Sequence, residues 1–352
     1  MPKRSRKGYT HFGKTHRARI GEILIALRPG STSALEVIFE RRQAESRDHS
    51  MRPKLMPMKD AIKSFVKDGD TIALSSANYN RIAMAAVREI IRQGKKNLTV
   101  AKTLGSFDIE LLLAADLVKK IIASWASIGV VWGVSKVFRE KVESGAVEFE
   151  EWSNFGINLR FEAAAMGVPF LPTFAMIGSD IPKQNGAKMV KCPYTGSDLL
   201  AVPALFPDVA VLHVQKADKF GNAVIDGPIL ADPSIARAAR HVVVTAEEIV
   251  DTSEIRREAD RCAIPFFLVD AVVWAPYGSH PYDCYGCYDM DHAHVDSYVQ
   301  SIEAKGIGYA KEYLQEWVYG VKDHFEYLNS LPLDHLVTLS EAAKGIRLGW
   351  EE

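Results

Sequence analysis

The sequence contains one spacing typical of metal or redox chemistry, the pair Cys284 and Cys287 in YGSHPYDCYGCYDMDHAH, with His280, His292 and His294 nearby. A structural zinc site needs two good ligand pairs, and the second pair here, His292 and His294, stands among carboxylates. A thioredoxin-type pair should begin a helix after an early strand, whereas this pair comes late in the chain. We therefore predict small buried or half-buried thiols and no metal.

Other signatures of self-sufficient enzymes are missing from the sequence. Neither G-x-x-x-x-G-K-[ST] nor G-x-G-x-x-G follows a predicted strand, which disfavours nucleotide hydrolysis and nicotinamide binding. Gly178 and Ser179 in MIGSD lack the G-x-S-x-G frame of a serine hydrolase. We therefore predict no catalytic residue in this chain.

Polar side chains in two loops after predicted strands could instead bind a substrate. The serines and the asparagine offer hydroxyl and amide donors to a carboxylate or thioester oxygen, although they could equally cap a turn. Arg81 could pair with the distal acid of a dicarboxylate or lie exposed at a helix start, and Asp108 could simply cap a helix. The six candidates are Ser75, Ser76, Asn78, Arg81, Ser106 and Asp108.

Apolar strands alternating with amphipathic helices must position these loops. The pattern predicts an α/β fold with an open, mostly parallel sheet covered by helices on both faces. Ligands bind beyond the carboxyl ends of the strands in such sheets. His213, inside an apolar strand, is expected to be a satisfied core histidine. The strands are expected at 71–74, 98–102, 120–124, 208–214, 241–245 and 266–274, and the helices at 59–67, 82–92, 111–115, 135–143 and 157–166.

The composition is that of an ordinary globular protein. Of 352 residues, 47% are hydrophobic and 25% are charged, which excludes disordered and coiled-coil classes. No stretch approaches the roughly 20 apolar residues that a membrane span needs. The 4 cysteines are too few for a disulfide framework, so we expect a cytoplasmic protein that contacts no membrane.

The two ends of the chain differ from the central region. Residues 1–55 hold 13 basic and 5 acidic residues, and we expect a poorly ordered extension and not a nucleic-acid-binding segment. We place an α/β domain at 56–295. Aromatic residues recur at helical spacing after Asp296, which predicts a helical arm at 296–352 that packs on the domain or on a partner subunit.

Several blocks resemble the family I coenzyme A transferases, and most closely the A subunits of glutaconate CoA-transferases. The likeness spans about residues 58–339, and the turn KADKFGN at 216–222 follows the apolar strand as in that family. From their residue types alone, Lys219, Gly221 and Asn222 are expected only to shape a tight turn. The other blocks are KDAIKSFVKDGDTIAL at 59–74, AAVREIIRQG at 85–94, EAAAMGVPFLP at 162–172, VTAEEIV at 244–250, VDAVVWAPYGSHPYDCYG at 269–286 and EWVYGVKDHFEYLN at 316–329.

The resemblance implies a heteromeric enzyme that moves CoA between an acyl-CoA and a carboxylic, possibly dicarboxylic, acid. In that family the glutamate that forms the glutamyl-CoA thioester belongs to the B subunit, so the partner expected here is a B subunit. No cofactor is expected besides the CoA thioester, which is a substrate. By position in the family, Gly178 and Ser179 are expected in the acid-binding pocket.

Departures from the family pattern keep two alternatives open. Side chains at Ser75 and Ser76 and around Leu104 replace glycine-rich stretches of the relatives, which makes glutaconate itself doubtful as a substrate. A sister group hydrolytically opens a ring of CoA-linked steroid fragments. It uses a glutamate near the position of Ser153 and Asn154, neither of which is a carboxylate. A noncatalytic acyl-CoA-binding or scaffold subunit is the other alternative.

Overall fold

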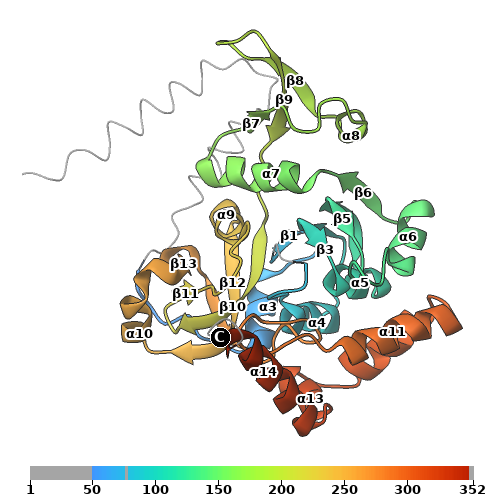
Figure 1. Ribbon diagram of the computed structural model, residues 1–352, viewed down its shortest axis with the longest axis vertical. Helices are drawn as coiled ribbons and strands as arrows, with labels where there is room; N and C mark the ends of the chain where they lie inside the picture. Colours follow the sequence, from blue (N-terminus) through green and yellow to red (C-terminus); the bar gives the residue numbers. More distant parts are fainter. Residues whose placement is uncertain (1–49, 76–77, 349–352) are drawn as a thin grey trace, which may run out of the picture. The chain divides into compact units, whose positions relative to one another are not determined.

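A seven-stranded parallel layer forms the centre of the largest sheet in the computed structural model, which describes residues 50–75 and 78–348 (Figure 1). Six of its strands overlap the six apolar segments predicted from the sequence, so the prediction of an open, mostly parallel sheet is confirmed. In spatial order the strands are β6 (Glu148–Glu151), β4 (Val118–Ala123), β2 (Leu98–Ala101), β1 (Thr71–Leu74), β10 (Val209–Asp218), β12 (His241–Val250) and β14 (Ala271–Trp274).

The long strand β10 continues beyond the end of β1 and there pairs with the antiparallel β11 (Ala223–Val224), which pairs with β13 (Cys262–Ile264). The turn from β10 to β11 is held by Asp218, whose Oδ1 accepts N–H bonds from Phe220, Gly221 and Asn222. Gly221 has a φ of 105°, which favours glycine. Gly221 and Asn222 therefore shape a turn, as predicted.

Helices cover both faces of the sheet because successive strand residues point to opposite sides. Ile72 and Leu74 of β1 belong to one apolar core, whereas Ala73 belongs to the other. The first core includes residues of α3 (Met58–Phe65), α4 (Met84–Arg92), α5 (Phe107–Ala114) and α6 (Lys136–Glu143), and the second includes residues of α7 (Asn154–Met166) and α9 (Asp232–Ala238).

The carboxyl-terminal helices pack on the same domain. Tyr298 and Tyr313 are buried and lie 4.7 Å and 5.4 Å, between ring centroids, from Phe107 of α5. The arm was expected to pack on the domain or on a partner subunit, and in the structure these aromatic residues pack on the domain. The arm consists of α11 (His292–Lys305), α12 (Tyr309–Leu314), the π-helical turn η3 (Gln315–Tyr319), α13 (His324–Asn329) and α14 (Leu333–Leu348).

A small antiparallel sheet extends from the body beside α7 (Figure 1). The sequence predicted only an extended segment at its start. The remaining short elements are α8 (Ile181–Asn185), α10 (Thr252–Arg257), η1 (Ala259–Arg261), η2 (Phe266–Leu268), β3 (Leu104–Gly105) and β5 (Trp125–Ala126). The small sheet consists of β7 (Phe170–Thr173), β9 (Asp198–Pro203) and β8 (Lys188–Lys191).

Two boundaries differ from the prediction. The segment expected as one central strand at 266–274 is a 3-10 turn followed by β14, which lies at the side of the parallel layer because, among the described strands, it pairs only with β12. The extension expected at 1–55 ends sooner, since Leu55 pairs with Val272 and Lys54 is buried. The predictions for residues 1–49 and for Ser76 lie outside the described residues. Among the described helices, none has the length and apolar character that a membrane span requires.

Candidate substrate-binding edge

The loops after β1 and β2 carry the candidate polar side chains, and further polar residues follow β4 and β6 at the same edge. β1 lies between β2 and β10, so the chain turns to opposite sides of β1 at this point of the sheet. A crevice for a ligand is expected at such a switch of strand order. The loops that the sequence analysis singled out after β1 and β2 lie at this edge, and the structure shows how their side chains are held.

Lys102 and Asp108 form a fully buried ion pair that organises the loop after β2. The Lys102 Nζ lies 2.6 Å from the Asp108 Oδ2, and both side chains have no exposed surface. The other oxygen, Asp108 Oδ1, accepts bonds from the N–H of Ser106 and of Ile109. Asp108 therefore lies in the first turn of α5 and bonds the backbone there, whereas the N-cap position that was its alternative role is occupied by Ser106. Lys102 is the partner that sequence reasoning missed.

Ser106 joins this loop to the loop after β1. Its hydroxyl donates to the carbonyl oxygen of Asn78 and lies 2.9 Å from the Asn78 Oδ1. Ser106 is buried, whereas Asn78 is half-buried. The structure therefore brings together two predicted site residues that are distant in sequence, and Asn78 is the more accessible of the two.

Ser75 is directed into the protein and not toward the edge. It is fully buried, and its Oγ accepts the backbone N–H of His213 at 3.1 Å. The His213 ring lies 2.8 Å from Thr245 Oγ1 and 2.6 Å from Glu247 Oε1. His213 is a satisfied core histidine, as predicted, and Ser75 positions the strand ends.

Arg81 has a different role from the one expected. Its guanidinium pairs with the carboxylate of Asp232 at 2.6 Å, and neither side chain is exposed. A second nitrogen donates to the carbonyl oxygen of Pro228 at 2.6 Å. Arg81 therefore ties the loop after β1 to α9, and the expectation that it clamps a substrate acid or lies exposed is replaced by this structural role.

A second polar row continues along the edge, and none of its residues was among the substrate-binding candidates from the sequence. Thr103 donates to Asn158 Oδ1 at 2.8 Å, and Ser124 contacts both the Thr103 carbonyl oxygen and Asn154 Oδ1. Ser153 caps α7 by accepting the N–H of Gly156 at 3.0 Å. In the sequence, Thr103 and Ser124 were detectable only as single polar residues after apolar strands, and Ser153 and Asn154 only through their position in the sister group.

Gly178 and Ser179 lie in an exposed turn after β7. Ser179 donates to the carbonyl oxygen of Met176 at 2.8 Å. A Cβ on Gly156, in the first turn of α7, would lie 2.8 Å from the Met176 side chain. The turn therefore packs against the start of α7, the helix that also presents Asn154 to the polar row.

The cysteine and histidine residues of the late segment do not assemble into the zinc set that their spacing suggested. His280 lies 2.7 Å from the Tyr327 hydroxyl and 3.1 Å from an Asp291 oxygen, and His294 contacts the Tyr313 hydroxyl. Burial raises the pKa of the Cys284 thiol well above its usual value. Cys284 thus has the character of a small buried group, as expected.

Cys284 also lies in another cluster of possible ligands. Its sulfur and ligand atoms of His213 and Glu247 all lie within 4.8 Å of one another. The Glu247 carboxylate already accepts bonds from the backbone N–H groups of Tyr277 and Gly278 and from the Tyr288 hydroxyl. We assign this cluster to the hydrogen-bonded core.

Three glutamates that could have served as nucleophiles are held by other side chains. Glu110 is buried with a raised pKa, and it accepts bonds from Ser135 and Tyr298. Glu89 accepts bonds from Arg92 and Gln93 of its own helix and the turn that follows. Glu162 accepts a bond from the Ser234 hydroxyl.

One other carboxyl near the edge has altered acidity. Burial and the neighbouring Asp289 raise the pKa of Asp283 to about 6. The carbonyl oxygen of Asp283 accepts the backbone N–H of Arg81 at 2.9 Å, so this acid lies beside the loop after β1.

Comparisons with known proteins identify the family. Residues 55–275 match the family model described as coenzyme A transferase. The chain is 42% identical over 291 residues to an uncharacterised protein of Archaeoglobus fulgidus, a match that covers 82% of this chain but only 65% of that protein. It is 37% identical over 303 residues to the A subunit of glutaconate CoA-transferase from Acidaminococcus fermentans, covering 81% of this chain and 94% of that relative.

The fold of the chain matches a solved structure of the same kind. The crystal structure of glutaconate coenzyme A-transferase from Acidaminococcus fermentans superposes with a TM-score of 0.75 at 37% identity, covering 81% of this chain and 95% of that one. The family model, the relatives and the fold agree. The chain therefore belongs to the coenzyme A transferase family.

Proposed function

We propose that this chain is the A subunit of a heteromeric CoA-transferase, which moves CoA between an acyl-CoA and a carboxylic acid. The observation that carries the proposal is the match, along nearly the whole length of the relative, to the A subunit of a glutaconate CoA-transferase. The edge described above agrees with a subunit that binds and orients substrate. The glutamate that receives CoA is assigned to a B subunit.

The proposed chemistry explains why a donor-rich edge is useful. A carboxylate of the partner attacks the thioester carbonyl, and the CoA thiolate leaves as an acyl anhydride forms. The thiolate then attacks the glutamyl carbonyl of the anhydride, which releases the acid and leaves a glutamyl-CoA thioester; an acceptor acid reverses both steps. Negative charge develops on carbonyl oxygens, and positioned donors such as the Asn78 amide stabilise it. The reaction requires no cofactor beyond CoA.

The proposal specifies neither the chain length nor the charge of the acceptor acid. Arg81 was the residue expected to bind the second carboxylate of a dicarboxylic acceptor. Because its guanidinium pairs with Asp232, it no longer supports such an acceptor. The sister hydrolase chemistry is also weakly supported. Ser153 caps α7 and Asn154 accepts a bond from Ser124, and neither residue can act as a carboxylate base. We place the enzyme in the cytoplasm, where its four free cysteines would stay reduced.

Co-purification with a B subunit allows a direct test. The complex is incubated with a panel of acyl-CoA thioesters, with and without a panel of carboxylic acids, and the new thioesters are followed by mass spectrometry. We expect CoA to appear on an acceptor acid, with little thioester loss when the acid is omitted. Loss of thioester to water with no dependence on an acceptor would favour the hydrolase, and no turnover of any kind would favour the scaffold subunit.

A further inference from the structure

The two cysteines of the C-x-x-C motif lie at the ends of a tight turn. The backbone N–H of Cys287 donates to the carbonyl oxygen of Cys284 at 2.8 Å, and the same oxygen accepts the N–H of Tyr288 at 3.2 Å. Gly286 adopts the left-handed conformation inside the turn, with a φ of 75°. A β-turn holds the Cα atoms of its first and last residues within about 7 Å, and a disulfide spans about 4.4–6.8 Å. The backbone therefore holds the two cysteines near the separation that a disulfide requires.

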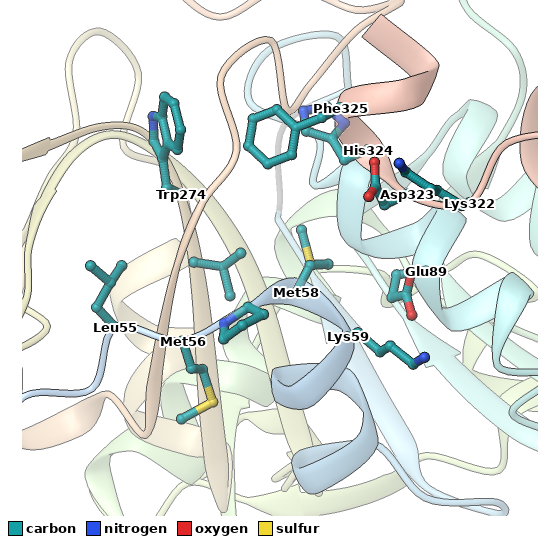
Figure 2. Close-up of a pocket in the computed structure, with 12 residues that line it drawn as sticks. Leu55, Met56, Met58, Lys59, Glu89, Trp274, Lys322, Asp323, His324 and Phe325 are labelled. Atoms are coloured by element: carbon teal, nitrogen blue, oxygen red, sulfur yellow. The ribbon is translucent and has the colours of Figure 1, made fainter.

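The two thiols are in contact but differ in their access to solvent. Both are free, and the side chain of Cys287 hydrogen-bonds to that of Cys284. Cys284 has no exposed surface, whereas Cys287 is half-buried. Neither cysteine lines the pocket of about 680 Å³ that opens beside β14 (Figure 2), so a reaction at the turn is separate from any ligand bound there. A reagent in the solvent therefore reaches Cys287 first and has Cys284 as the adjacent second thiol.

A carboxylate lies beside the buried sulfur. The Cys284 sulfur is within 4.8 Å of a Glu247 oxygen and of a His213 ring nitrogen. Burial raises the pKa of the Cys284 thiol, so this sulfur stays protonated until a base takes its proton. The Glu247 carboxylate is such a base, because it is an acceptor without a proton of its own near pH 7. The buried thiol can therefore be activated in place.

We propose that Cys287 and Cys284 are a peroxide-reactive pair that closes to a reversible disulfide within the turn. The Cys287 thiolate attacks one oxygen of a peroxide, the O–O bond breaks, and a sulfenic acid forms while hydroxide leaves. The Cys284 sulfur then passes its proton to Glu247 and attacks the Cys287 sulfur, and the sulfenic oxygen leaves as water with that proton. The pair loses two electrons and two protons, and hydrogen peroxide becomes two molecules of water. A small thiol reverses the reaction by thiol–disulfide exchange.

The position of the turn explains why a reversible product is useful. The carbonyl oxygen of Asp283, next to Cys284, accepts the backbone N–H of Arg81 at 2.9 Å, which connects the turn to the loop after β1. Both cysteines also pack in an apolar cluster with side chains of α13 and α14. Further oxidation of Cys287 to a sulfinic acid would place a charge against this cluster, and thiols do not reverse it. The disulfide is uncharged and stops the oxidation before that stage.

Peptide mass spectrometry of the folded full-length chain treated with hydrogen peroxide tests the pair. After the peroxide is removed, the remaining thiols are alkylated in denaturant, and the peptides are mapped without reductant. We expect the peptide with Cys284 and Cys287 to lack two hydrogens and to regain them with a thiol reductant. Cys192 is the internal control, because hydrogen bonds from Thr195 and from backbone N–H groups lower the pKa of its thiol. It should gain oxygen atoms instead, since its hairpin between β8 and β9 contains no second cysteine.

Two variants separate the roles of the two thiols. In Cys284→Ala, peroxide should add two oxygen atoms to Cys287, and thiols should not remove them. In Cys287→Ala, the buried Cys284 should be oxidised at least about tenfold more slowly than the wild-type pair. An unmodified wild-type pair beside an oxidised Cys192 would overturn the proposal, as would equal oxidation of Cys284 in the wild type and in Cys287→Ala. These readouts do not involve CoA transfer, so they are independent of the proposed function.

Discussion

The ion pair of Arg81 and Asp232 links the loop that follows β1 to α9, which lies 151 positions later in the chain. Both side chains are fully buried, so removing one partner leaves a charge in the protein interior. The pair therefore fixes the position of the loop that carries Asn78. Arg81 variants should therefore lose stability, and any loss of substrate affinity should occur together with that loss of stability.

We predict that Asp232→Asn lowers the free energy of unfolding by about 3 kcal/mol, because it strands the Arg81 charge. Urea denaturation followed by circular dichroism measures this change. Asp198→Asn is the control, since Asp198 pairs with Lys191 at the surface and should cost less than about 1 kcal/mol. If the two variants were equally stable, the Arg81 pair would not hold the loop.

Sequence reasoning succeeded at residues whose partners are near in the chain. Asp108 was expected to bond the backbone at a helix start, and it does bond the N–H groups of Ser106 and Ile109, although from the first turn of α5 and not from the N-cap. It failed for Lys102 as a partner of Asp108 and for Arg81, since a lysine at the end of an apolar strand or an arginine before a helix does not reveal a buried partner. Burial of a charge depends on the tertiary fold, which spacing along the chain does not contain.

At the scale of elements, the helical arm depends on aromatic contacts with α5. Its periodic aromatic residues predicted helices, but the period cannot tell whether they face their own domain or a partner. Tyr313 is 3% exposed and packs edge-on against Phe107. Removing the arm should therefore expose the core of the domain, beyond any effect on a partner subunit.

We predict that Tyr313→Ala lowers the free energy of unfolding by about 3 kcal/mol, through a cavity between α5 and α12. Thermal and urea unfolding of the purified chain measure this effect. Tyr319→Ala provides the comparison, because Tyr319 is 45% exposed in the following turn and should change stability by less than about 1 kcal/mol. Similar losses in both variants would contradict this account of the arm.

Buried histidines in and beside this arm make its stability depend on pH. Burial lowers the pKa of His294 and of His324 to about 3, and that of His280 is also lowered. The charged groups around these rings include Arg88, Arg92, Asp291 and His335. Asp291 Oδ2 lies within hydrogen-bond distance of both His280 and His335. In the unfolded chain each histidine takes up a proton near pH 6.5.

We predict that the arm is most stable above pH 6.5 and loses stability as the pH falls from 6.5 toward 3. In that window the unfolded chain binds protons that the folded chain excludes, which favours unfolding. Melting temperatures measured from pH 8 to pH 5 should decrease, and His294→Leu should reduce the slope. His292→Gln, at an exposed position, should leave the slope unchanged. A flat profile in the wild type would show that these rings accept protons in the folded state.

The elements that the sequence missed share a physical reason. Six of the seven parallel strands, all except β6, have apolar residues toward both faces, so their composition identified them. β8, with the sequence KMVK, is mostly exposed, and β6, with the sequence EFEE, is half-exposed and held by ion pairs such as that of Lys120 with Glu150. Strands of this kind are stabilised by their neighbours, and their composition resembles that of a loop.

For the whole molecule, the proposed function assigns substrate binding to this chain and the nucleophilic glutamate to a B subunit. This chain presents donors at a sheet edge, and its glutamates Glu89, Glu110 and Glu162 are all held by hydrogen bonds. A carboxylate held in this way is poorly placed to attack a thioester. The chain purified alone should therefore show no turnover of acyl-CoA, and turnover should appear when the B subunit is added to it.

The final prediction concerns the location of the covalent intermediate. The complex is mixed with acyl-CoA and trapped with hydroxylamine or borohydride, and both chains are mapped by mass spectrometry. We expect the modification on one glutamate of the B subunit, because a thioester must form on a carboxylate that can reach the substrate carbonyl. Replacing that glutamate by glutamine should abolish the adduct, whereas Glu110→Gln should preserve it. A trapped adduct between residues 58 and 339 of this chain would make this chain the catalytic subunit, since the modified residue identifies where CoA is transferred.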